Sequence, residues 1–283
     1  RDRSPSRGLG DVYKRQQRNK AYMKNVYFLS DAHLGAKLLK DNQEREIMLV
    51  EFLQNVKLDC LELYLLGDMF DFWFEYKHVV PNGHVRFLAE LANFTDQGIK
   101  VHFFTGNHDI WAFDYLAKEC GVILHTSMME TTINGKSFLI GHGDGLNPND
   151  KGYLFLRNVF HNRFLQRCFR FIHPDWGIAL ANKWSSHSRL KGNGQIEARG
   201  YLGDDKEEIV IYCRNILKEH HVDYFIFGHR HLPLNLELES NSHYINTGDW
   251  ITHFSYAVFD GEKVSLEKID RKKQPILNCF SMK

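Results

Sequence analysis

The sequence predicts an α/β fold in which helices and strands form layers, and three observations lead to this prediction. Across the first 110 residues, short apolar runs alternate with segments of helical periodicity. This alternation favours an α/β fold over an all-β fold or a helical bundle. After residue 231, apolar and polar residues alternate with period two, which is typical of antiparallel strands. The chain has 283 residues, 43% of them hydrophobic, which is enough for a sizeable core.

The elements follow in order from these patterns. Residues 25–30 form the first apolar run, and the helix after it is predicted at 42–56, where Ile47, Val50 and Leu53 recur at helical spacing. Further strands are expected at 61–66, 100–105, 122–124 and 223–227, and further helices at 84–96, 112–120 and 205–220. Asn134-Gly135 predicts a hairpin over 128–140. Antiparallel strands are expected at 234–238, 243–246, 255–259 and 263–267.

Residues 145–205 differ from the rest of the chain. Apolar residues there are interspersed with many cations, and glycines at 192, 194 and 203 punctuate the segment. We therefore expect a helical insertion over about 145–205. A single large domain is expected over 21–283, with residues 1–20, polar and rich in arginine, as a disordered or non-native N-terminal segment.

Composition limits the partners and the compartment. The formal net charge is +1, so no nucleic-acid partner is expected. The five cysteines have no CxxC spacing, which argues against a disulfide framework or a structural zinc site and favours a reducing compartment. No apolar run approaches the roughly 18 residues of a membrane span. These features predict a cytoplasmic location; they give no oligomeric state.

Five predicted strands end in similar polar motifs. Each combines two or more of glycine, histidine and a carboxylate or amide residue, and we expect the five motifs to meet in one site. The motifs are Asp31-Ala32-His33, Gly67-Asp68-Met69-Phe70-Asp71, Gly106-Asn107-His108-Asp109, Gly141-His142-Gly143-Asp144 and Gly228-His229-Arg230-His231.

These side chains are ligands for divalent metals. Carboxylate, amide oxygen and imidazole suit ions such as Mn²⁺, Fe²⁺ and Zn²⁺. A site for two ions needs a carboxylate able to bridge them, and Asp68, in the central motif, is the natural candidate. Asp31, His33 and one late histidine would complete the first metal; Asn107, His142 and another late histidine would complete the second. We expect two divalent ions, Mn²⁺ foremost, with Fe²⁺ or Zn²⁺ as alternatives.

The five motifs, in this order, resemble those of the calcineurin-like metallophosphoesterases. The resemblance implies an α/β four-layer sandwich, with two mixed β-sheets flanked by helices and a helical insertion as a cap. It also implies two ligand sets: Asp31, His33, Asp68 and His231 for one metal, and Asp68, Asn107, His142 and His229 for the other.

The same resemblance implies catalysis by a water that the two ions activate for attack on phosphorus. His108 is expected to act on the phosphate as a donor of a hydrogen bond or proton, with Asp71 fixing its tautomer. The alternative is that each is an ordinary polar residue of a turn.

The sequence after His142 narrows the resemblance. The run from Gly141 to Tyr153, with Arg157 one helical turn later, resembles the UDP-2,3-diacylglucosamine hydrolases of lipid A biosynthesis. That family cleaves a pyrophosphate with water, releasing UMP and 2,3-diacylglucosamine 1-phosphate (lipid X) at the inner-membrane surface. The resemblance implies a lipid-linked UDP-sugar as substrate, a peripheral position at that membrane, and substrate contacts by Asp150, Tyr153, Arg157 and Arg189.

The sequence leaves two alternatives to the lipid-linked substrate. Several members of that family carry arginine where this chain has His108, and a histidine there also suits a phosphodiesterase or phosphatase for a soluble nucleotide. The other alternative is a non-catalytic binding scaffold, against which the complete ligand set argues. The aromatic residues at 69–80 and in the insertion suit either core packing or a wall for acyl chains.

Overall fold

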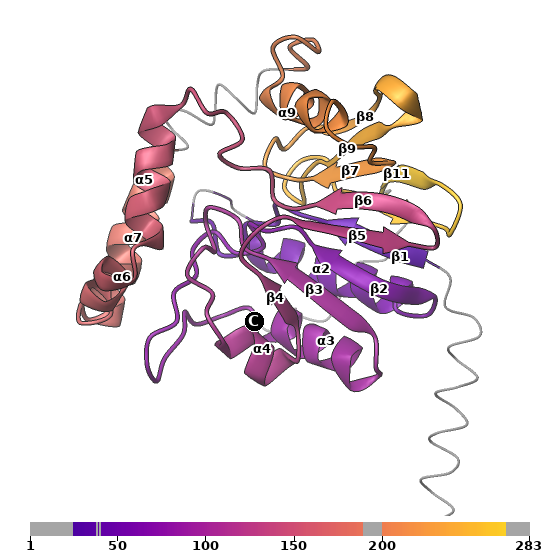
Figure 1. The fold of residues 1–283 in the computed structure, drawn as a ribbon. Coiled ribbons are helices and arrows are strands. Elements are labelled where there is room, and N and C mark those ends of the chain that lie inside the picture. Colours follow the sequence, from indigo (N-terminus) through magenta and orange to yellow (C-terminus); the bar gives the residue numbers. More distant parts are fainter. Residues whose placement is uncertain (1–24, 38, 40, 189–199, 270–283) are drawn as a thin grey trace, which may run out of the picture.

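The computed structural model describes residues 25–37, 39, 41–188 and 200–269. Two β-sheets face each other, with helices on their outer faces and three further helices standing to one side (Figure 1). The predicted N-terminal segment, residues 1–20, lies outside the described residues. In the part of the chain that is described, no helix is both long and apolar enough to cross a membrane.

The first sheet has six strands in the order β11-β10-β1-β2-β3-β4. Its four parallel strands are β1 (Asn25–Leu29), β2 (Cys60–Leu65), β3 (Lys100–Phe104) and β4 (Ile123–His125). The edge is completed by two antiparallel strands, β10 (Ser255–Phe259) and β11 (Val264–Lys268). Its outer face is covered by α2 (Asn42–Val56), α3 (Val85–Asp96) and α4 (Tyr115–Cys120).

The second sheet has five strands in the order β5-β6-β7-β9-β8. The parallel strands are β6 (Lys136–Ile140), β7 (Tyr224–Phe227) and β9 (His243–Thr247). Antiparallel strands β5 (Met129–Ile133) and β8 (Pro233–Glu237) form its edges. α9 (Glu208–Leu217) covers the outer face, and a 3₁₀ turn, η2 (Glu239–Asn241), follows β8.

Three hydrophobic clusters hold these layers together. One lies between α2, α3 and the first sheet, where Phe52 and Phe94 pack with Phe103. The second lies between the two sheets, and the third packs α9 against the second sheet. Three cores between four layers confirm the predicted α/β four-layer sandwich of two mixed sheets.

The insertion contains three helices, α5 (Lys151–His161), α6 (Arg163–Phe169) and α7 (Pro174–Ser188), which we call the cap. They form an arm beside the sheets (Figure 1). Asn162 separates α5 from α6, and its side chain accepts hydrogen bonds from the first amides of α6. The cap is fastened to the body where Trp111 Nε1 donates to Phe160 O at 2.9 Å and where the rings of Phe74 and Phe169 pack at 4.8 Å.

Two local differences from the predicted elements have physical causes. The helix expected from residue 112 begins at Tyr115, because the buried Glu75 carboxylate accepts hydrogen bonds from the amides of residues 113–115 and caps its first turn. The closing strands form two antiparallel pairs, and the pairs belong to different sheets. Period two is the same in either sheet, so the pattern alone does not assign a strand to one of them.

Candidate metal centre

The predicted metal ligands meet at one edge of the two sheets. They follow the carboxyl ends of β1, β2, β3, β6 and β7, which lie side by side in the two parallel sets. Ligand atoms lie within 4.8 Å of one another in three groups: Asp31, His33 and His231; His33, Asp68 and His108; Asp68, His142 and His229. The sequence therefore brings residues almost 200 positions apart into one site, as the motifs predicted.

Asp68 lies between the first and the last of these groups. Its Oδ2 is 3.6 Å from Nε2 of His33 and 3.3 Å from Nε2 of His142. Its other oxygen, Oδ1, accepts a hydrogen bond from the His108 amide at 2.8 Å. One carboxylate oxygen thus faces both groups, which is the position that a bridging ligand requires.

The remaining ligand atoms surround two positions. Around the first, Nε2 of His231 lies 3.2 Å from Oδ1 of Asp31 and 3.3 Å from Nε2 of His33. Around the second, Oδ1 of Asn107 lies 3.3 Å from Nε2 of His142. Imidazole nitrogens directed at carboxylate and amide oxygens form a donor set that fits two divalent ions.

The outer nitrogens of the same histidines face oxygen atoms of the protein. Nδ1 of His142 donates to Leu66 O at 2.8 Å, while Nδ1 of His231 lies 3.6 Å from Oδ2 of Asp249. Nδ1 of His33 is 3.4 Å from Oδ1 of Asp71. These contacts orient each ring and leave its Nε2 lone pair directed into the site, as in metal-binding histidines.

Backbone conformation is unusual at the predicted ligands. Five of them, namely Asp31, His33, Asp68, His229 and His231, have φ between 42° and 65°. A residue with a side chain seldom adopts this left-handed conformation, so its occurrence at five predicted ligands indicates a backbone shaped by the site. Each turn directs a side chain toward the centre immediately after its strand ends.

Two glycines allow these turns to approach one another. A Cβ atom at Gly106 would lie 2.7 Å from the Asp68 backbone nitrogen, and one at Gly228 would lie 2.5 Å from Oδ2 of Asp31. Both distances are well below van der Waals contact, so only glycine fits without displacing a ligand.

Buried Asp109 holds two of the turns together. Its carboxylate accepts hydrogen bonds from the amides of Gly106 at 2.7 Å, Met69 at 2.9 Å and Asp68 at 3.2 Å. On the other side, Oδ2 of Asp31 accepts from the His229 amide at 2.9 Å. Neither Asp109 nor Asp249 was assigned a role from the sequence, because each acts through amides and rings that only the fold brings near.

Electrostatics at the site favour bound cations. Burial opposes charge on His231, but the Asp31 carboxylate raises the pKa of His231 to about 10. Burial also disfavours charge on His142, but the Asp68 carboxylate outweighs this effect and raises the pKa of His142 well above its usual value. These imidazoles lower the pKa of both carboxyl groups against the effect of burial. Positive charge is therefore needed here, and divalent ions would supply it by displacing the two protons.

His108 and Asp71, the predicted catalytic residues, lie beside this cluster. Nδ1 of His108 donates to the main-chain oxygen of Asp71 at 2.8 Å, whereas the Asp71 carboxylate oxygen is 3.7 Å away. The same carboxylate oxygen lies closer to His33. The backbone of Asp71 thus fixes the His108 tautomer that the sequence analysis attributed to its side chain.

The predicted substrate contacts lie on α5 or outside the described residues. Asp150 caps α5 by accepting from the Tyr153 amide at 2.9 Å. The Tyr153 hydroxyl donates to Oδ2 of Asp144 at 2.8 Å, and Nε of Arg157 is 3.3 Å from the same oxygen. Asp144, which was given no role from the sequence, therefore fastens α5 to the loop that carries the predicted ligand His142. Arg189 lies outside the described residues.

The calcineurin-like phosphoesterase family model matches residues 24–233. The chain belongs to this family. A UDP-2,3-diacylglucosamine hydrolase of Porphyromonas gingivalis is 36% identical over 255 residues, which cover 87% of this chain and 97% of that protein. Enzymes of the same name from Haemophilus influenzae and Proteus mirabilis are 29% and 30% identical, covering 82% and 84% of this chain and 93% and 96% of theirs.

Membership confirms the predicted family and enzyme class: the chain is a metal-dependent phosphoesterase, with divalent metal ions as its cofactors. The matched region includes β1 to β7 and the cap, and so contains strands of both sheets. Which phosphoester this calcineurin-like phosphoesterase cleaves depends on what lies around the metal centre.

Proposed function

We propose that this phosphoesterase hydrolyses the pyrophosphate bond of UDP-2,3-diacylglucosamine to give UMP and 2,3-diacylglucosamine 1-phosphate. The observation that carries the proposal is similarity over nearly the full length of hydrolases named for this substrate. The coverage includes the segment that forms the cap, which the metal-binding motifs alone would not require.

The residues of the site suit this reaction. Asp31, His33, Asp68 and His231 would hold one ion, and Asp68, Asn107, His142 and His229 the other, with Mn²⁺ as the proposed metal. Bound ions would lower the pKa of water and polarise phosphoryl oxygens. In the hydrolysis, a water oxygen bonds to one phosphorus and its proton passes to solvent, while the bridging oxygen leaves with the other phosphate. His108, with Nδ1 held by the Asp71 carbonyl, presents Nε2 to the phosphate and in its protonated form donates to the leaving oxygen.

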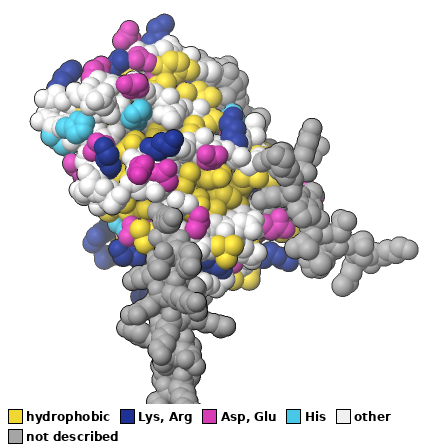
Figure 2. Space-filling model, turned by 90° about the vertical axis from the view of Figure 1, so that its right-hand side faces the viewer, with side chains coloured by type: hydrophobic (Ala, Val, Ile, Leu, Met, Phe, Trp, Pro, Cys, Tyr) yellow, Lys and Arg dark blue, Asp and Glu magenta, His cyan; other side chains and the backbone are white. Residues whose placement is uncertain are grey.

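The cap suits an anionic lipid substrate. Between residues 151 and 188 the sequence carries six cationic residues, Lys151, Arg157, Arg163, Arg167, Arg170 and Lys183, against one acidic residue, Asp175. On the face turned away from the cap, cationic and anionic side chains are interspersed (Figure 2). Phosphate and the surface of the inner membrane, both negatively charged, would therefore be attracted to the cap.

Exposed aromatic side chains on the cap support a peripheral position at that membrane. Phe171 is 92% exposed and Trp176 is 73% exposed. Aromatic rings beside cations are favoured at the interface of an anionic bilayer. Replacing both with serine should weaken binding to phosphatidylglycerol vesicles about tenfold, whereas Leu58→Ser, at an 80% exposed apolar residue on the body, should leave binding unchanged. Equal binding by all three proteins would refute membrane docking by the cap.

The function is tested with the full chain loaded with Mn²⁺ and UDP-2,3-diacylglucosamine in mixed micelles. UMP release that stops on chelation and is absent in Asp68→Ala is the expected result. Hydrolysis of a simple phosphodiester without UMP release would favour the soluble-nucleotide enzyme. Bound metal without hydrolysis of any phosphoester would favour a binding scaffold.

A further inference from the structure

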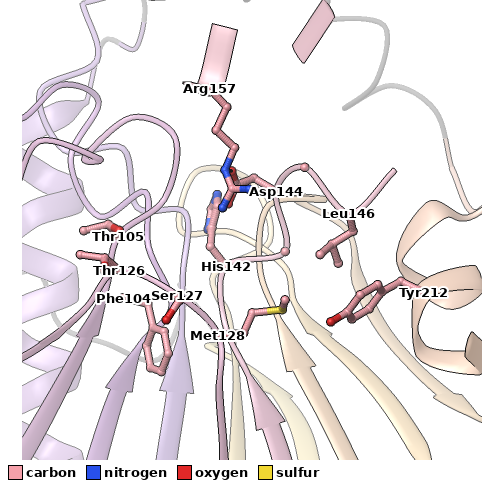
Figure 3. A pocket seen from close by; sticks show the side chains of 12 residues that line it. Phe104, Thr105, Thr126, Ser127, Met128, His142, Asp144, Leu146, Arg157 and Tyr212 are labelled. Carbon is pink, nitrogen blue, oxygen red and sulfur yellow. Dashed lines mark ion pairs between the residues drawn. The ribbon is translucent and has the colours of Figure 1, made fainter. Parts of the chain in front are cut away.

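A cavity of about 310 Å³ lies beside the metal centre; Arg157, one of the predicted substrate contacts, lines it, whereas Asp150 and Tyr153 do not. Figure 3 shows it between the loops that follow β3 and β4 on one side and α9 on the other, with His142 at its centre. His142 is also a predicted metal ligand, so a group bound in the cavity would be adjacent to a phosphate held at the metals.

One wall of this cavity offers hydrogen-bonding groups that the protein leaves unused. Thr126 and Ser127 are exposed and follow directly after β4. Within the described residues, neither their hydroxyls nor their amides take part in a hydrogen bond. Two adjacent residues thus present both donors and acceptors to whatever occupies the cavity.

Asp144 adds an acceptor between this wall and the metals. Its Oδ2 receives the contacts of Tyr153 and Arg157, whereas its Oδ1 accepts no hydrogen bond from any described residue. The side chain is only 11% exposed. A carboxylate oxygen without a donor, on a side chain that is mostly buried, suits a vicinal pair of hydroxyls, as in ribose.

The rest of the lining is apolar. Leu146 and Tyr212 face the cavity from the opposite side, and Met128 lies between the two sides, below His142 (Figure 3). A flat heterocycle could pack on them while its polar edge meets residues 126 and 127. Acyl chains would fit poorly, because they would leave the hydroxyls and Asp144 without partners.

We propose that this cavity binds the nucleoside half of the substrate, with Asp144 accepting from the ribose hydroxyls and the Thr126–Ser127 segment contacting the pyrimidine edge. The proposal rests on the proposed function for the identity of the nucleotide. In this arrangement the pyrophosphate lies at the metals, the nucleoside lies in this cavity, and the lipid half lies outside it.

The test compares the affinities of UMP, 2′-deoxy-UMP and inorganic phosphate for the Mn²⁺-loaded full chain by calorimetry. Ser127→Trp fills the cavity from an exposed bend, and Thr132→Trp, exposed on β5 outside the cavity lining, is the matched control. In the wild-type protein and the control, UMP should bind at least about tenfold more tightly than phosphate, and more tightly than 2′-deoxy-UMP.

In Ser127→Trp the preference for UMP over phosphate should fall to near onefold because UMP affinity falls, whereas Thr132→Trp should keep the wild-type preference. The nucleoside site would be overturned if Ser127→Trp kept the wild-type preference for UMP over phosphate, or if the wild-type protein showed no such preference. The assay contains no lipid. UMP discrimination that behaves as expected, without hydrolysis of UDP-2,3-diacylglucosamine, would therefore support this site and reject the proposed function.

Discussion

Arg230→Met should destabilise the protein strongly, although Arg230 is not a predicted metal ligand. It stands between His229 and His231 and is 9% exposed. Its Nε and Nη2 donate to the two carboxylate oxygens of Glu207, each at 3.1 Å. Glu207, only 4% exposed, precedes α9 and also accepts from the Leu202 amide at 3.1 Å. The pair therefore joins the turn of the predicted ligands His229 and His231 to the segment that precedes α9.

The magnitude follows from what the substitution leaves behind. Methionine fills much of the arginine stem but leaves the Glu207 charge buried without its guanidinium. Breaking such a pair on one side costs about 3–5 kcal/mol, whereas replacing both partners by apolar groups is often close to neutral. For a chain of this size, each kcal/mol lowers the melting temperature by about 2–4 °C. The loss of Arg230 should therefore lower it by at least about 6 °C.

Urea unfolding of wild type, Arg230→Met, Glu207→Leu and the double variant measures this directly. The double variant should be more stable than Arg230→Met alone. Metal affinity, measured on the same proteins, should fall about 10–100-fold in Arg230→Met because the flanking ligands lose their support. A loss below about 1 kcal/mol, or strictly additive effects in the double variant, would refute the argument.

Two further outcomes can be measured on single variants. Asp68→Ala should bind neither metal ion, whereas His108→Ala should keep both ions and turn over about 10²–10⁴-fold more slowly. Metal content and turnover measured on both variants test this prediction. Loss of metal in His108→Ala would contradict the placement of His108 outside the ligand set. Burial works against ionisation of Asp223, but its contacts with Ser137 and Lys136 lower the pKa of this carboxyl to about 2. A depressed folded pKa stabilises the protein above the unfolded value of 3.8, and this stabilisation is lost as pH falls toward 2. Asp223→Asn should thus be less stable than wild type at pH 7, and the difference in stability should narrow as the pH falls from 3.8 toward 2. Urea unfolding of the metal-free proteins measures this difference.

The sequence was sufficient for features that depend on neighbouring residues. The helix at 42–56 was predicted with its observed bounds, because its apolar spacing marks one face over four turns. The α/β class followed from the alternation of strand and helix patterns, and the four-layer arrangement was implied by the family resemblance. The five motifs converge because parallel strands carry their carboxyl ends to one edge. Each motif held enough local information, a strand followed by ligand-type residues, to be placed at that edge.

Other features depend on contacts between distant segments and were not predictable. Asp109 resembles any turn aspartate until the fold brings the amides of β2's turn to its carboxylate. The tautomer of His108 is fixed by a main-chain oxygen, which no side-chain pattern records. Asp144 gave no signal either, because its partners lie on a helix whose direction the sequence does not specify.

The same turns explain why the metal centre and the fold depend on each other. A left-handed backbone at a residue with a side chain costs about 1–2 kcal/mol, and five ligands adopt it. The three amides that bond to Asp109 return only about 0.5–1.5 kcal/mol each. Buried Asp31 and Asp68 add a desolvation cost that neighbouring imidazoles offset only while protonated. The amides of His108 and His229 donate to these two carboxylates and offset part of this cost. Bound cations would add further stabilisation, so metal binding would help to hold the ends of β1, β2 and β7 in the observed shape.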